Sequence, residues 1–433
     1  MSNKEKSMGY IVFLSVVAAI GGILFGYDTA VISGTTEIVK AQFGLSTGME
    51  GWFVGCALIG SIIGVLVAGM LSDFLGRKKT MLISALMFSV SAIGCAVCGN
   101  FGQLVLYRMI GGFGIGVVSI VSPIYISEVA PAEKRGTLVS LYQLFITIGF
   151  LLAYLMNYLI LRGAALDATG TELGTRMFNQ EYWRGMFGCE AIPDLLFLVL
   201  IFFIPESPRW LAIRGQRQDK SEEWKALREP GILKAVLIGS AIAILGQFMG
   251  VNAVLYYGPK IFQDAGLSGE GSMFSTVLVG VVNMLTTVIA LLIIDKVGRK
   301  QLVWWGVGGM IVCLLCIGTW FAVGTMPTWF LLTFFLLYVF CTAISISAVV
   351  FVLLSEMYPN RVRGLAMSIA GLALWVGTYL IGQLTPWMLE NLTPAGTFFL
   401  FAFCCLPYLF IMWKYIPETT GKTLEEIEAY WKK

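Results

Sequence analysis

Apolar residues in this chain are gathered into long runs, and the polar residues between them form shorter segments. Each run has about 20 residues, the length that an α-helix needs to cross the hydrocarbon core of a bilayer. The pattern predicts an all-α membrane protein with twelve transmembrane helices. The expected spans are residues 9–33, 50–72, 79–98, 101–124, 138–161, 183–204, 233–258, 272–294, 301–323, 329–355, 364–388 and 396–416.

Three short phrases in the polar segments occur twice, in the same order. A repeat of this kind in a membrane protein indicates two related halves. We therefore expect two pseudo-symmetric six-helix bundles, residues 1–205 and 235–416, with a cytoplasmic linker, 206–234, and a cytoplasmic tail, 417–433. The repeated phrases are Asp73 to Lys79 with Asp295 to Lys300, Ser127 to Gly136 with Ser355 to Gly364, and Pro205 to Arg209 with Pro417 to Gly421.

Composition and charge agree with a membrane protein. Only 13% of the residues are charged and 58% are hydrophobic, whereas a soluble domain carries about 25% charged residues. Lys and Arg are concentrated in the segments that share one side with both termini, such as Arg77 to Lys79 and Arg209 to Lys234. Because positive charge marks the cytoplasmic side, we expect a multi-pass protein of the cell inner membrane with both termini cytoplasmic. The net charge of +3 follows from this bias and indicates no nucleic-acid partner.

The residue types argue against catalysis. The chain has no histidine, and no nucleophile stands in a recognisable pairing with a base, so we do not expect an enzyme. Two Cys-x-x-Cys pairs, Cys95 with Cys98 and Cys313 with Cys316, lie in apolar runs without a second ligand pair. That context favours buried thiols over a metal site. We expect no metal, no cofactor and a monomer in the lipid bilayer.

Asp28 stands in the first predicted helix, and Arg108 near the start of the fourth. A carboxylate at membrane depth is costly and points to function. If both helices belong to one bundle, the two side chains can meet, and protonation of Asp28 would then release Arg108 and link proton binding to conformation. A static buried ion pair is the alternative. Glu190 in the sixth span is a further deep carboxylate.

The seventh span is unusually polar, with Gln247, Asn252, Tyr256 and Tyr257 before a break expected at Gly258-Pro259. Amides both donate and accept hydrogen bonds, which suits adjacent sugar hydroxyls. Aromatic rings can stack on the apolar face of a pyranose. Helix–helix packing is the alternative role for each residue alone. The expected substrate site also includes Gln143, Asn283, Trp375 and Phe351.

The doubled phrases carry acids and glycines as well as the basic residues that set topology. Glu128 with Arg135, and Glu356 with Arg363, could form salt bridges between loops. Such pairs would hold the cytoplasmic side shut in a protein whose halves rock. The expected cytoplasmic gate comprises Asp73, Gly76, Arg77, Glu128, Arg135, Glu206, Arg209, Asp295, Gly298, Arg299, Glu356, Arg363 and Glu418.

Together these motifs resemble the sugar porter family of the major facilitator superfamily over essentially the whole chain. The resemblance implies the major facilitator fold and alternating access around a central monosaccharide, a pentose such as D-xylose or a hexose. It implies that Asp28 carries the proton with Arg108 as its partner, so that transport is proton-coupled symport. It also implies sugar contacts from Gln143, Gln247, Asn252 and Asn283, with Phe25, Tyr257 and Trp375 around them.

The chain departs from the family pattern at several places. The family usually has Gln-Gln where this chain has Gly246-Gln247. At the positions of Phe150, Leu374 and Phe351, a pentose-transporting member of the family has polar or larger side chains. A Gly-Pro kink in the tenth span is replaced by Ser347-Ala348, so we expect that kink to be absent. A sugar uniporter and a sugar sensor that does not transport remain alternatives to a symporter.

Overall fold

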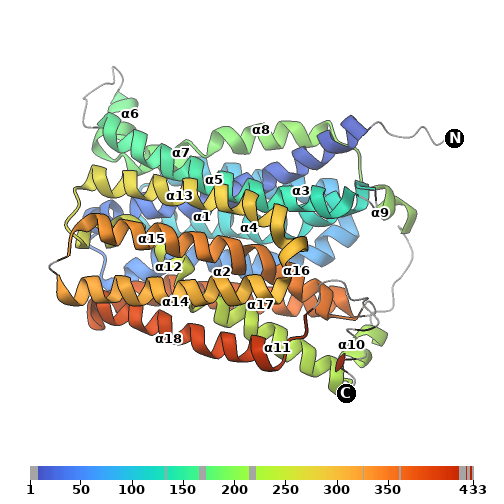
Figure 1. The fold of residues 1–433 in the computed structure, drawn as a ribbon. Helices are drawn as coiled ribbons and strands as arrows, with labels where there is room; N and C mark the ends of the chain where they lie inside the picture. Colours follow the sequence, from blue (N-terminus) through green and yellow to red (C-terminus); the bar gives the residue numbers. More distant parts are fainter. Residues whose placement is uncertain are drawn as a thin grey trace. The chain divides into compact units, whose positions relative to one another are not determined.

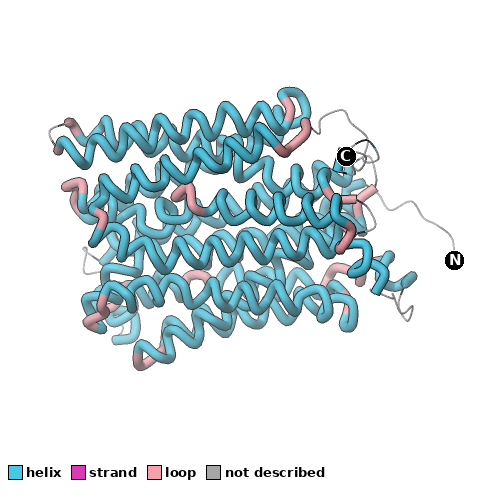
Figure 2. Tube along the Cα trace, turned by 90° about the horizontal axis from the view of Figure 1, so that it is seen from below, coloured by secondary structure: helices cyan, strands magenta, loops and turns pink. Residues whose placement is uncertain are grey.

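The structure of the protein is a computed structural model that describes residues 8–131, 134–164, 172–213, 221–324, 326–359, 362–418, 426 and 430–431. These residues form helices and connecting turns, with no strand among them (Figure 2). Within the described residues, twelve helical segments are long and apolar enough to cross a membrane. The predictions of an all-α protein and of twelve spans are confirmed. Most of the expected tail, 417–433, lies outside the described residues.

The chain forms two compact units. The first contains Met1–Gly44 and Cys56–Gln216, and the second contains Leu45–Gly55 and Arg217–Lys433. The segment Leu45–Gly55, which the sequence pattern assigns to the first half, thus clusters with the second unit. Its contacts explain the assignment, because the fully buried Glu50 accepts a hydrogen bond of 2.8 Å from Lys260 Nζ.

The first unit is built from helices around α1 and α4, coloured blue to green in Figure 1. α1 packs along α5 and also contacts α4, while α3 contacts α4 and α8. The helices are α1 (Met8–Phe43), α2 (Thr47–Leu75, whose first residues belong to the second unit), α3 (Arg77–Val97), α4 (Phe101–Val129), α5 (Arg135–Ala164), α6 (Glu172–Thr175), η2 (Arg176–Gln180), α7 (Trp183–Gly188), α8 (Ala191–Phe202) and α9 (Pro208–Ile213).

The second unit has the same kind of construction, with α11 packed on α17 and α14 packed on α15 and α18. Its helices, coloured green to red in Figure 1, are α10 (Ser221–Leu227), α11 (Pro230–Gln247), α12 (Val251–Asp264), α13 (Gly269–Val297), α14 (Arg299–Val323), α15 (Thr328–Thr342), η3 (Ala343–Ser347), α16 (Ala348–Met357), α17 (Arg363–Asn391) and α18 (Thr393–Lys414).

Glycines allow α1 and α5 to approach closely. A Cβ atom at Gly26 would lie 2.1 Å from the carbonyl oxygen of Ile146, and one at Gly149 would lie 2.2 Å from that of Ile23. Any larger residue would push the two backbones apart. Membrane helices associate through such small residues because lipid offers no hydrophobic drive for their contact. This contact anchors the part of α1 that carries Asp28.

Two predicted helix irregularities are wrong in position or kind. The seventh span does not break at Gly258-Pro259, since Pro259 lies inside α12; it breaks between α11 and α12, where Gly250 has a left-handed φ of 88°. The sequence predicts a regular tenth span at Ser347-Ala348, but the π-helical segment η3 ends there and distorts the helix. Wider helical turns of this kind distort a helix without glycine or proline.

We expect Gly250→Ala to destabilise the protein. Alanine in a left-handed conformation costs about 1–2 kcal/mol, and the new Cβ would lie 2.3 Å from the Phe401 ring. The thermal unfolding temperature of the purified protein in detergent measures this effect. Gly246→Ala is the matched control, because the nearest atom to its Cβ would be 3.6 Å away. Equal unfolding temperatures for the two variants would contradict the assignment of the break to Gly250.

Candidate functional site

Asp28 and Arg108 meet inside the first unit. Both side chains are 2% exposed, and Arg108 Nη1 forms a short ion pair with Asp28 Oδ1. The same nitrogen lies 3.2 Å from the Asp28 carbonyl oxygen, and the guanidinium lies over the Phe187 ring at 5.3 Å. Asp28 Oδ2 and Arg108 Nε have no hydrogen-bond partner within the described part of the chain. Asp28 is therefore bonded to Arg108 through one carboxylate oxygen, while its other oxygen accepts no hydrogen bond from the described residues.

Two further acids lie close to this ion pair. Glu190 and Asp194 are both buried, and they stand one helical turn apart at the start of α8. Asp28 interacts electrostatically with both, and Arg108 interacts with Glu190. Sequence reasoning identified Glu190 but missed Asp194. The signal was present, because an acid four residues after Glu190 in an apolar run lies on the same helix face.

In the second unit, the amides of the seventh span form a hydrogen-bonded cluster. Asn252 Nδ2 donates to Gln247 Oε1 at 2.6 Å, and Thr378 Oγ1 donates to the same oxygen at 3.2 Å. These contacts join the end of α11, the start of α12 and α17. Half-buried amides that bond to each other can exchange those bonds for hydroxyl groups of a ligand. Tyr257 instead donates to the Gly382 carbonyl oxygen at 2.7 Å.

The other substrate candidates fall into two sets. Gln143 on α5 and Phe25 on α1 belong to the first unit, while Asn283 on α13, Trp375 on α17 and Phe351 on α16 belong to the second. Asn283 and Trp375 are buried, whereas Phe351 is 48% exposed. Among these candidates, Gln247 and Asn252 are joined directly by a hydrogen bond. The roles of all these residues in binding remain predictions.

The first copy of the doubled phrases forms one compact cluster. Arg77 pairs with Glu128, with Nη2 to Oε1 at 3.0 Å and Nε to Oε2 at 3.1 Å, and also contacts Asp73 at 3.3 Å. Glu206 accepts the backbone N–H groups of Arg77 and Lys78 at 2.9 and 3.1 Å. A carboxylate at a helix start is favourable because it meets unpaired N–H groups and the positive end of the helix dipole.

The second copy has the same arrangement. Arg299 Nη2 pairs with Glu356 Oε1 at 3.0 Å, and Glu418 accepts the backbone N–H groups of Arg299 and Lys300 at 3.2 and 3.1 Å. Gly76 and Gly298 precede the capped helices with φ of 96° and 99°. At Gly76 a Cβ would lie 2.3 Å from Glu206 Oε2. Glycine is therefore needed for the turn and, at Gly76, for the approach of the carboxylate.

Several expected salt-bridge partners differ from the prediction. The partner of Glu128 is Arg77 rather than Arg135, which is exposed, and Arg299 pairs with Glu356. Arg363 donates to the Tyr358 carbonyl oxygen at 3.3 Å, although Glu356 still attracts it electrostatically. Arg209 is exposed on α9. The Asp295 side chain lies outside the described part of the structure. Glu128, whose side chain is 4% exposed, thus pairs with the arginine that is itself buried. A buried carboxylate is destabilised unless a charge of opposite sign compensates it.

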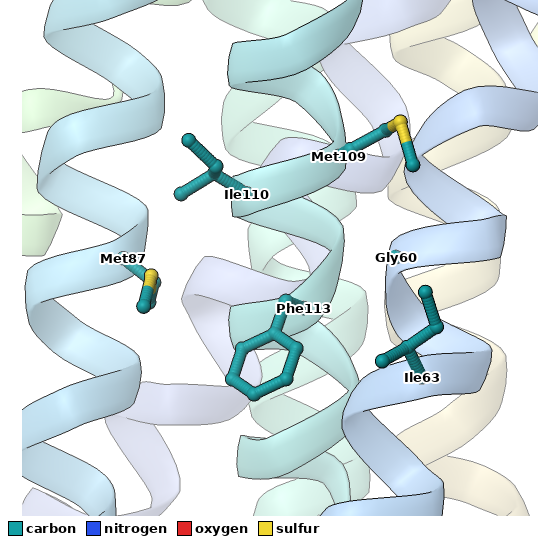
Figure 3. A pocket seen from close by; sticks show the side chains of 6 residues that line it. All are labelled: Gly60, Ile63, Met87, Met109, Ile110 and Phe113. Atoms are coloured by element: carbon teal, nitrogen blue, oxygen red, sulfur yellow. The ribbon is translucent and has the colours of Figure 1, made fainter.

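An apolar groove of about 220 Å³ lies between α2, α3 and α4 of the first unit (Figure 3). A sugar needs several hydrogen-bonding partners, and the side chains that line this groove offer none of the required amides, hydroxyls or charges. The groove is therefore not a sugar site. It is lined by Gly60, Ile63, Met87, Met109, Ile110 and Phe113.

Comparison with known proteins agrees with this geometry. The sequence profile described as "Sugar (and other) transporter" matches residues 14–230 and again 217–431. The chain belongs to this sugar transporter family. The double match has the same two-copy form as the repeated loops, and it confirms the family inferred from the motifs.

Named relatives of this family member cover almost all of it. The chain is 36% identical to the arabinose-proton symporter of Bacillus subtilis and 36% identical to the D-xylose-proton symporter of Escherichia coli, in both cases over 99% of this chain and 97% of the relative. The inward-open structure of the xylose transporter XylE from E. coli matches with a TM-score of 0.82 and 37% identity, over 98% of this chain and all of that chain. This sugar transporter family member is thus a multi-pass membrane protein with the major facilitator fold.

We expect Arg77→Gln to destabilise this transporter strongly and Arg135→Gln to have little effect. Removing Arg77 leaves Glu128, whose side chain is 4% exposed, without its ion-pair partner. Breaking a buried pair in this way costs about 3–5 kcal/mol, whereas an exposed substitution changes stability by about 0.5 kcal/mol or less. Thermal unfolding in detergent compares the two. A larger drop in unfolding temperature for Arg135→Gln than for Arg77→Gln would support the pairing of Glu128 with Arg135 instead.

Proposed function

We propose that this protein is a proton-coupled monosaccharide symporter that works by alternating access. The observation that carries the proposal is the buried Asp28–Arg108 ion pair. It lies in a chain that is 36% identical to relatives named as an arabinose-proton and a D-xylose-proton symporter. We further propose that the protein lies in the inner membrane as a monomer, with both termini in the cytoplasm, because Lys and Arg are enriched on that side.

Asp28 is the proposed proton carrier. When it is ionised, one oxygen is held by Arg108 and the other is free of hydrogen bonds to the described residues. A proton that binds there removes the charge that holds Arg108. The guanidinium then needs new partners, because a buried cation without an acid is unstable. Proton binding would in this way favour a different arrangement of α1 and α4, which is the link that symport requires.

The proposed sugar contacts are the amides Gln143, Gln247, Asn252 and Asn283, with Phe25, Tyr257, Trp375 and Phe351 as apolar neighbours. The hydrogen bond from Asn252 to Gln247 supports a role for this pair, because it keeps both amides oriented. The relatives named for arabinose and D-xylose favour a pentose. The apolar side chains of Phe150 and Leu374 distinguish this chain from a pentose-transporting pattern and leave hexoses as candidates.

The two loop clusters are the proposed cytoplasmic gate. Each ties together three segments of one unit through an arginine and two carboxylates. A set of charges satisfied in this way stabilises one state and can be exchanged for other partners in another. Arg135, Arg209 and Arg363 are proposed as members that pair in a different state of the transport cycle, and Asp295 is proposed as a further member of the gate.

A uniporter is the second candidate. The observation that favours it is the additional contact of Arg108 Nη1 with the Asp28 carbonyl oxygen at 3.2 Å. This contact would hold the arginine even after Asp28 is neutralised. The ion pair would then be structural, and sugar movement would be independent of protons.

Asp28→Asn separates the two candidates. We expect the variant in proteoliposomes to lose accumulation of sugar driven by an inward proton gradient but to keep sugar counterflow, because asparagine cannot exchange a proton. The wild type is first tested with D-xylose, arabinose and glucose to find its substrate. Gradient-driven accumulation that survives in Asp28→Asn would exclude Asp28 as the proton carrier and favour another coupling group. A wild type that shows sugar counterflow but no gradient-driven accumulation would favour the uniporter.

Gln247→Ala tests the sugar site. We expect the concentration for half-maximal counterflow to rise about 5- to 150-fold, corresponding to about 1–3 kcal/mol for a buried partner left unpaired. Gln263→Ala is the control, because Gln263 is exposed at the end of α12. An unchanged half-maximal concentration in Gln247→Ala would remove this amide from the proposed site.

A further inference from the structure

Asp194 is a buried acid that no part of the fold explains. Its side chain is 0% exposed, and neither carboxylate oxygen has a hydrogen-bond partner among the described residues. A residue that only stabilised the packing of α8 would use its oxygens for hydrogen bonds, as buried polar groups almost always do. An ionised carboxylate left without donors costs several kcal/mol. The environment of Asp194 therefore suits a carboxyl group that binds a proton.

The position of Asp194 on α8 partly favours the ionised form instead of the protonated one. Asp194 lies in the first turn of α8, which follows a break after α7. The positive end of the helix dipole favours a negative charge there. Burial favours the neutral acid and the helix terminus favours the anion, so neither form is excluded. A proton at this carboxyl can consequently be exchanged rather than held permanently.

The surroundings connect Asp194 to the ion pair. α8 packs against α1 and α3, and Asp194 interacts electrostatically with Asp28 across the contact with α1. Asp28 pairs with Arg108, and Glu190 interacts electrostatically with both of them, whereas Asp194 interacts with Asp28 and Glu190. The titratable and charged groups around Asp194 and Glu190 are Tyr27 and Asp28 from α1, Cys189 from the junction of α7 and α8, Cys95 from α3 and Arg108 from α4.

We propose that Asp194 is a second proton-binding site of this transporter, whose proton occupancy depends on the charge of Asp28. When Asp28 is ionised against Arg108, repulsion between the two carboxylates keeps a proton on Asp194. When Asp28 takes up a proton, that repulsion disappears and Asp194 can ionise. The exchange balances, because one proton is bound at Asp28 as one is released at Asp194. This inference rests on the proposed symport function, but proton binding at Asp194 can be measured without transport.

Infrared spectroscopy of the purified protein in lipid tests proton binding directly. We expect a carboxylic-acid C=O band that disappears as the pH is raised and that is absent in Asp194→Asn. In Asp28→Asn the band should disappear at lower pH, because the repelling charge is gone. The absence of an Asp194-dependent band, or a band that neither pH nor Asp28→Asn changes, would overturn the proposal.

Transport provides the second measurement. We expect Asp194→Asn to keep sugar counterflow, which also shows that it folds, and to lower sugar accumulation under a fixed proton gradient. Asp194→Glu keeps an acid at this position and should retain accumulation if Asn is not tolerated. Unchanged accumulation in Asp194→Asn would overturn the proposal as well. If the wild type itself shows no gradient-driven accumulation, the symport function fails, while the infrared result still decides whether Asp194 binds a proton.

Discussion

A charge can remain inside a membrane-spanning bundle only if other groups satisfy it there. This constraint accounts for the positions of the buried charges in both units. Arg108 satisfies one oxygen of Asp28, and Lys260 pairs with the fully buried Glu50. Glu206 and Glu418 receive backbone N–H groups at the starts of α3 and α14. The helices are arranged so that these acids meet donors that other segments supply, whereas Asp194 has no such donor among the described residues.

The same constraint applies to the two loop clusters, each of which contains a glycine, an arginine and two carboxylates. A glycine with positive φ lets the chain turn into α3 or α14, and the arginine that follows reaches a carboxylate on a different helix. The second carboxylate caps the new helix. The arginine, the two carboxylates and the glycine of each set thus act on the same helix start. Their pairing ties the ends of several helices in each unit into one cluster.

The twelve spans and the meeting of Asp28 with Arg108 could be predicted from the sequence, because both depend on the cost of exposing charge to lipid. The helix breaks could not. Gly258-Pro259 has the composition of a break, yet the break occurs at Gly250, where the Phe401 ring fills the space beside the glycine. The partner of Glu128 also depends on tertiary packing, since Arg77 and Arg135 are equally plausible in sequence and differ only in burial.

The loop clusters and the Asp28 region differ in one respect that matters for proton coupling. In the first-unit loop cluster, Asp73, Glu128 and Glu206 all accept hydrogen bonds from Arg77 or from the backbone. Around Asp28, oxygens of all three acids lack partners among the described residues. One arginine cannot compensate three carboxylates, so protons must supply the remaining neutralisation. Proton dependence in this unit should therefore originate where charge is undercompensated, near Asp28, rather than in the gate.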